Sequence, residues 1–188
     1  MRKDTFLLAL ILLGAGCRSI GTKTDKAMGT KRVQERLGVA QFVIPVDWTA
    51  FPSVDDSSIQ YYPEDADVVL RASALVFEIK DKTKRIDLES YLDNIPSLVN
   101  AEKGKTRAGS AWRKITTTDK EGKHTSWQVA EIQGTRLVLL VFTYSDFLPK
   151  GDPRVPTLLE CAESAVDSTQ FLNTKNIVGS AWSTKGHN

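Results

Sequence analysis

The sequence has little of the chemical equipment that catalysis usually requires. Among its 188 residues there are two histidines, His124 and His187, and two cysteines, Cys17 and Cys161. These side chains are too few for a zinc site of Cys and His ligands. Gly104 and Gly109 have the spacing of a phosphate-binding loop but lack the Lys-Ser/Thr that should follow. We therefore expect a protein that is not an enzyme and that carries no metal and no cofactor.

The sequence also lacks an excess of charge of one sign. It has 25 Lys and Arg against 23 Asp and Glu, so its net charge is +2. A nucleic-acid-binding protein usually has a pronounced basic excess, so we expect no nucleic-acid partner. The hydrophobic fraction of 41% is that of an ordinary globular protein, and the length suits one domain.

Long hydrophobic runs are absent except at the N-terminus. Residues 6–13 are all apolar, follow Arg2 and Lys3, and precede the small residues 14–16. At about 1.5 Å per helical residue this run is too short to cross about 30 Å of hydrocarbon. The order of a basic start, an apolar run and small residues indicates a secretory signal peptide.

The residues before Cys17 resemble the lipobox of bacterial lipoproteins. Ala15, Gly16 and Cys17 fit that motif, whereas Gly14 stands where the family usually has Leu. The resemblance implies that residues 1–16 are removed and that Cys17 is acylated, which would attach the chain firmly to a membrane. The alternatives are an ordinary signal peptide or an uncleaved anchor. If Cys17 carries lipid, Cys161 has no partner for a disulfide within the mature chain.

Composition divides the rest of the chain into three parts. Residues 17–37 are polar and rich in Lys and Arg, so we expect a flexible linker there, either a solvated tether or a segment attracted to an anionic membrane surface. Residues 38–172 form a single α+β domain. Residues 173–188 form a polar tail that contains Trp182.

Hydrophobic patterns within the domain predict about six strands and two main helices. The helices begin near Asp87 and Asp152, which are suitable capping residues, and Pro96 should end or kink the first. Residues 137–142 are apolar on both faces, which predicts a central strand covered on both sides. Segments 47–52 and 101–110 are expected to be loops. The predicted strands are 39–44, 59–62, 68–80, 111–118, 125–133 and 137–142, and the predicted helices are 87–95 and 153–168.

The order of these elements resembles the PsbP-like/DcrB-like superfamily. The resemblance covers roughly residues 39–171, and Pro96 within the first helix departs from the pattern. It implies an antiparallel sheet packed between helices and a non-enzymatic adaptor, chaperone or assembly factor, often with a lipoprotein signal. The residues that carry it are Phe42, Ile44, Pro45, Trp48, Leu88–Tyr91, Asp167, Ser168 and Phe171.

Trp48 and Phe51 are the candidate partner-binding residues, because Trp is enriched at binding hot spots and both flank a predicted loop. The alternative for Trp48 is a core position at the edge of the sheet. The acidic residues of the stretch 55–67 are either a weak calcium site or a solvated rim. The basic stretch 103–114 opposes the acidic stretch 47–67, which either orients the protein or forms two ordinary solvated faces.

Together these observations predict a lipoprotein of the bacterial cell envelope that binds a protein or a lipid-like partner. Arg18 is not the acidic residue associated with inner-membrane retention, which favours the outer membrane, facing the periplasm. One alternative is an immunity or inhibitor lipoprotein that neutralises a periplasmic toxin. Another is an enzyme that uses surface carboxylates or serines.

Overall fold

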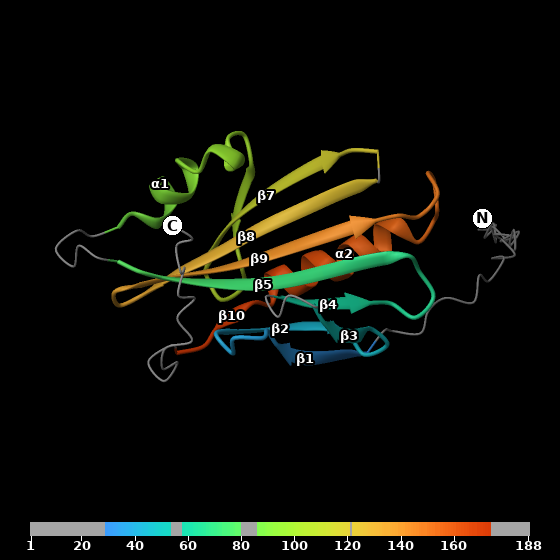
Figure 1. Cartoon of the computed structure of the whole chain (residues 1–188), viewed down its shortest axis with the longest axis horizontal. Helices are drawn as coiled ribbons and strands as arrows, with labels where there is room; N and C mark the ends of the chain where they lie inside the picture. The colour runs from blue at the N-terminus through green and yellow to red at the C-terminus, as the bar shows by residue number, and fades with distance from the viewer. Residues whose placement is uncertain (1–28, 54–57, 80–85, 121, 174–188) are drawn as a thin grey trace, which may run out of the picture.

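The computed structural model describes residues 29–53, 58–79, 86–120 and 122–173, which form two sheets and two α-helices (Figure 1). Seven antiparallel strands follow the order β3-β4-β5-β9-β8-β7-β6, and a smaller sheet has the order β1-β2-β10. The elements are β1 (Thr30–Gln34), β2 (Ala40–Pro45), β3 (Thr49–Pro52), β4 (Ser58–Tyr62), β5 (Val68–Glu78), α1 (Leu88–Asp93), the 3-10 helix η1 (Pro96–Leu98), β6 (Glu102–Lys105), β7 (Ala111–Thr118), β8 (Lys123–Gln133), β9 (Arg136–Asp146), α2 (Val155–Asp167) and β10 (Gln170–Phe171).

The predicted α+β class, with an antiparallel sheet of about six strands packed against two main helices, is confirmed, and the large sheet has seven strands. The prediction of about six strands missed β3 and β6, which lie at the two edges of the large sheet within segments expected to be loops. All four residues of β3 are exposed, and β6 has the sequence Glu-Lys-Gly-Lys. Neither strand alternates apolar and polar residues, so neither has the usual sequence signal. An edge strand can form through backbone pairing with its neighbour and does not require burial of its side chains.

Strand β1 lies within residues 17–37, the predicted linker, so the predicted domain boundary at residue 38 is too late. It pairs with β2 over its whole length, from Thr30 opposite Pro45 to Gln34 opposite Gln41. The buried carboxylate of Glu35 holds the connecting turn by accepting hydrogen bonds from the backbone N–H groups of Leu37 and Val39. Burial is the main cause of the raised pKa of Glu35. Because most side chains of β1 are polar, the hydrophobic pattern of the sequence did not predict this strand.

Strand β9 is the central strand, as its apolar sequence predicted. It pairs over its full length with β5 on one side and β8 on the other. Val138, Leu140 and Phe142 belong to the core under α2 and the small sheet, whereas Leu137 and Leu139 belong to a second core under α1 and η1. Figure 1 shows α2 along the sheet near β5 and β9, and α1 beside β7.

The two helices begin and end for different reasons. Asp87 caps α1 by accepting a hydrogen bond from the N–H of Glu89, as predicted, and Pro96 begins a 3-10 helix after α1 has ended. The predicted cap of α2 is wrong by two positions. Arg154 occupies the N-cap position. Asp152 instead accepts a hydrogen bond from the backbone N–H of Arg154, at 2.9 Å. The apolar stripe of α2 consists of the buried residues Leu158, Ala162, Ala165 and Val166.

Two glycines set the hairpins that flank β8. Gly134, in the turn between β8 and β9, has a φ of 64°, and a Cβ atom there would meet no atom within 4 Å. Gly122, at the end of the β7–β8 turn, has a φ of 152°, and a Cβ atom there would lie 2.4 Å from the carbonyl oxygen of Asp146. The turn can therefore approach the end of β9 only because residue 122 lacks a side chain.

We expect Gly122→Ala to lower the free energy of unfolding by about 3 kcal/mol, because it combines an unfavourable φ with a backbone clash. Gly134→Ala is the matched control and should cost only about 1 kcal/mol, since it changes φ preference without a clash. Urea denaturation of both variants measures the difference. Equal losses would contradict the role assigned to the close approach at Asp146.

Candidate functional site

The exposed edge strand β3 carries one of the two predicted contact residues on its surface. The side chain of Phe51 is 53% exposed. Its ring meets that of Tyr62 on β4 in a T-shaped arrangement, with centroids 5.7 Å apart and an interplanar angle of 72°. Since β3 pairs only with β4 among the described strands, its other edge is open to pairing. An aromatic pair beside an open strand edge is a suitable surface for binding a partner.

Trp48 lies in the core instead. Its side chain is only 1% exposed and packs in the cluster beneath α2, as the alternative interpretation of this residue predicted. The turn that places it there is held from β1, where the Lys31 ammonium donates hydrogen bonds to the carbonyl oxygens of Val46 and Trp48, at 3.0 and 2.7 Å. Trp48 therefore fixes the start of β3 and does not contact a partner directly, which corrects its assignment as a contact residue.

A hydrogen-bonded chain of Asp119, His124 and Ser145 lies at the end of the sheet near the β7–β8 turn. The Nδ1 atom of His124 is 2.9 Å from the Ser145 hydroxyl, and Nε2 is 3.3 Å from Oδ1 of Asp119. We did not predict this grouping. The signal for it was the hairpin turn at Gly134, because counting along both strands from that turn places His124 opposite Ser145.

The position of Ser145 is unsuitable for nucleophilic catalysis. This residue lies in β9 between Val69 of β5 and His124 of β8, so the sheet ladder occupies its backbone N–H. When a serine attacks a carbonyl group, negative charge develops on the oxygen of the substrate, and free N–H donors beside the serine must stabilise it. The side chain of Ser145 is also largely buried. The arrangement is that of a cross-strand polar pair which ties the β7–β8 turn to the sheet.

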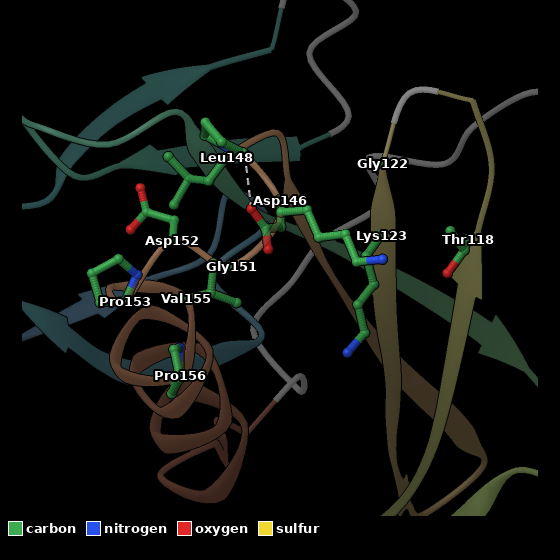
Figure 2. Close-up of a pocket in the computed structure, with 12 residues that line it drawn as sticks. Thr118, Gly122, Lys123, Asp146, Leu148, Gly151, Asp152, Pro153, Val155 and Pro156 are labelled. Atoms are coloured by element: carbon green, nitrogen blue, oxygen red, sulfur yellow. Dashed lines mark hydrogen bonds between the residues drawn. The ribbon is translucent and has the colours of Figure 1, made fainter.

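A hollow among the described residues lies on the face of the sheet opposite to the one that carries His124 and Ser145. It has a volume of about 630 Å³ and is bounded by the β7–β8 turn, the loop after β9 and the start of α2 (Figure 2). Asp146 lines it, so Ser145, the neighbouring residue of the strand, points to the other face. Arg154 lowers the pKa of Asp152 to about 2, so this carboxylate of the hollow stays ionised at neutral pH. The hollow and the histidine therefore do not form one site.

The predicted basic stretch 103–114 does not form a surface of one sign. Most of its charges are paired with carboxylates from other elements. Arg113 is only 1% exposed and contacts Glu89 and Asp93 of α1, at 2.6 and 2.8 Å. The remaining pairs are Lys103–Asp93, Arg107–Asp167, Lys114–Glu163 and Lys114–Glu102. These side chains hold α1 and α2 against the sheet, which favours the interpretation of an ordinary solvated face.

Several other sequence predictions fall partly or wholly beyond the part of the chain that the structure describes. Cys17, residues 1–16 and Trp182 lie outside the described residues, as do Asp55 and Asp56 of the acidic stretch. Within the described ranges, no group of three or more His, Cys, Asp and Glu side chains could hold a metal ion, and no helix is long and apolar enough to cross a membrane. Cys161 is half-buried on α2, and burial raises the pKa of its thiol.

No protein-family model matches this sequence, and no curated protein matches it. Solved structures with a similar arrangement exist at low identity. They include LpqN from Mycobacterium tuberculosis, described as involved in cell envelope biogenesis, with 17% identity, a TM-score of 0.48, and coverage of 78% of this chain and 92% of that chain. The solution structure of PsbP (CyanoP) from Synechocystis sp. PCC 6803 has 14% identity, a TM-score of 0.48, and coverage of 84% and 98%.

A crystal structure from Bacteroides thetaiotaomicron is also similar, with 18% identity and a TM-score of 0.44. The alignment covers 76% of the present chain, which spans only about half of the Bacteroides chain, at 48%.

Replacement of Arg113 tests how α1 is held. We expect Arg113→Met to lower the free energy of unfolding by about 2 kcal/mol, because the charge-assisted hydrogen bonds from the buried guanidinium to Glu89 and Asp93 are lost. Arg107→Met is the control and should cost about 0.5 kcal/mol or less, since Arg107 and its pair with Asp167 are exposed. Urea denaturation at pH 7 measures both variants. Similar losses would contradict a special role for Arg113.

The interaction between Arg113 and Asp93 should also make the free energy of unfolding depend on pH. Hydrogen bonds from Lys103 and Arg113 lower the pKa of Asp93 in the folded protein. Its contribution to stability is therefore complete above the unfolded pKa of about 4 and is lost as the pH falls below that value. In Arg113→Met this acid-side loss should be smaller than in the wild type. If the free energy of unfolding of Arg113→Met fell with pH below about 4 as steeply as that of the wild type, the coupling between Arg113 and Asp93 would be contradicted.

Proposed function

We propose that this protein is a lipid-anchored, non-catalytic binding module of the bacterial cell envelope, and that its partner is a protein contacted through the edge strand β3. The single observation that carries the proposal is Phe51, a large aromatic side chain left 53% exposed on a strand whose other edge pairs with no described strand. The lipoprotein-like segment that ends at Cys17 supports the membrane location.

The chemistry of β3 favours a partner that contributes an extended segment. An edge strand offers backbone donors and acceptors to such a segment, and exposed side chains beside the edge provide specificity. Phe51 and Tyr62 form an apolar surface at this position. Pro52, at the end of β3, has no backbone N–H, so pairing would end there. The interaction would therefore be short and would depend strongly on the aromatic pair.

The anchor determines which membrane-associated partners are within reach. Residues 18–28 separate Cys17 from Gly29, the first described residue, and would span at most about 40 Å when extended. The domain would thus remain close to the membrane surface. Arg18 directly after Cys17 favours the outer membrane, with the domain facing the periplasm.

A serine hydrolase is the second candidate, because Asp119, His124 and Ser145 form a hydrogen-bonded chain. The binding module remains the better interpretation, since the ladder occupies the N–H of Ser145 and the hollow lies on the other face of the sheet. Hydrolysis of simple esters that Ser145→Ala abolishes would favour the enzyme instead.

Replacement of Cys17 tests the anchor. We expect Cys17→Ser to move the protein from the membrane fraction to the soluble periplasmic fraction and to prevent incorporation of labelled palmitate, because the acylated sulfur is removed. Cys161→Ser is the matched control and should change neither property. Membrane retention of Cys17→Ser would contradict lipid anchoring.

The contact surface can be tested in intact cells with a photo-crosslinking amino acid. We expect position 51 to give a discrete crosslinked protein, because its side chain lies at the proposed contact. Position 99 is the control, since Val99 is 61% exposed and lies far along the chain, after η1. In addition, Phe51→Asp should abolish crosslinking from a reporter placed at position 49. The same product from positions 51 and 99 would contradict a contact specific to β3.

A further inference from the structure

Strand β5 extends well beyond its neighbour β4. The last pair between them is Ser58 opposite Ser73, whereas β5 continues to Glu78 and remains paired with β9 as far as Arg136. From Ala74 to Phe77, β5 therefore has a partner on only one side among the described strands. This stretch is a second open edge of the large sheet, separate from β3.

The open edge of β5 is apolar and accessible to solvent. Leu75 and Phe77 are each 46% exposed, and Val76 between them is 36% exposed. Successive side chains of a strand point to opposite faces, so apolar surface is exposed on both faces of the sheet here. Such an edge readily recruits another strand, and native proteins usually cover it. Helix α1 packs mainly on β7 and β8.

The described chain ends close to this edge. The backbone N–H of Leu172 donates to the carbonyl oxygen of Val39, and its own carbonyl accepts a hydrogen bond from the side chain of Gln133, at 3.0 Å. Gln133 lies opposite Arg136, which in turn lies opposite Glu78, the residue after Phe77. Figure 1 shows β10 and the last part of β5 at the same end of the molecule.

The sequence that follows Asn173 contains one apolar segment of strand-forming composition. Ile177, Val178, Ala181 and Trp182 are its apolar residues, and the rest of 174–188 is polar, charged or glycine. Neighbouring strands are about 4.8 Å apart, so the path from β8 past β9 to the far side of β5 is about 10–15 Å. Four extended residues span about 13 Å, which brings Ile177 to the open edge.

We propose that residues 176–182 pair as an additional strand with Ala74–Phe77 of β5 and cover its exposed apolar side chains. The chain's own tail is the occupant because it begins at β8, within about 15 Å of the edge. A tethered segment has an effective concentration in the millimolar range, far above that of a second molecule. A second copy paired edge to edge is the competing arrangement.

Amide hydrogen exchange on the full-length chain tests the proposal. In the wild type we expect slow exchange at those amides of residues 74–77 that do not bond to β9. In the double variant Ile177→Asp, Val178→Asp their exchange should be at least about 10-fold faster, because the added strand is lost. The matched control is Ser183→Asp, Thr184→Asp, which adds the same charge outside the apolar segment and should leave exchange unchanged.

Three results would overturn the proposal. The first is fast exchange at these amides in the wild type, and the second is equal exchange in the wild type and the Ile177→Asp, Val178→Asp variant. The third is protection that disappears on dilution together with a dimeric mass by light scattering, which would assign the edge to a second copy. Unchanged exchange at buried amides of β9 in every variant confirms that the fold is intact.

Discussion

The whole structure depends on the pairing of one strand, β9, with a neighbour on each side along its full length. Because Leu137–Leu140 are buried consecutively, this strand needs an apolar cover on both faces. Helix α2 and the small sheet provide one cover, and α1 with η1 provides the other. Arg113 joins the second cover to the sheet by pairing with two carboxylates of α1. The remaining strands extend this centre outward and become more exposed towards the edges.

The parts of the fold that depend on burial could be predicted from the sequence, and the parts that depend on pairing could not. The apolar run of β9, the stripe of α2 and the cap at Asp87 each have a local signal that the structure bears out. By contrast, β1, β3 and β6 are polar or exposed strands that exist because a neighbouring strand offers its hydrogen bonds. The same limit applies to the chain of Asp119, His124 and Ser145, which only the register of two hairpins brings together.

At the candidate contact surface, two aromatic residues close together in sequence have different positions: one is buried and one is exposed. Trp48 and Phe51 are three positions apart and both aromatic, so composition treats them alike. Trp48 occupies the core and, with the hydrogen bonds from Lys31, sets where β3 begins. Phe51 then lies on the exposed strand beside Tyr62. A buried side chain thus positions an exposed one.

Because residues 30–34 form a strand of the domain, the segment between Cys17 and the domain is shorter than the sequence predicted. Eight residues assigned to the linker, from 30 to 37, belong to the β1–β2 hairpin, which removes about 27 Å of possible extension from a tether that starts at Cys17. If Cys17 is acylated as proposed, this shorter tether would confine the domain to a thin layer above the lipid headgroups and would limit its tumbling. Neighbours embedded in the same leaflet would then meet it far more often than molecules that diffuse across the compartment.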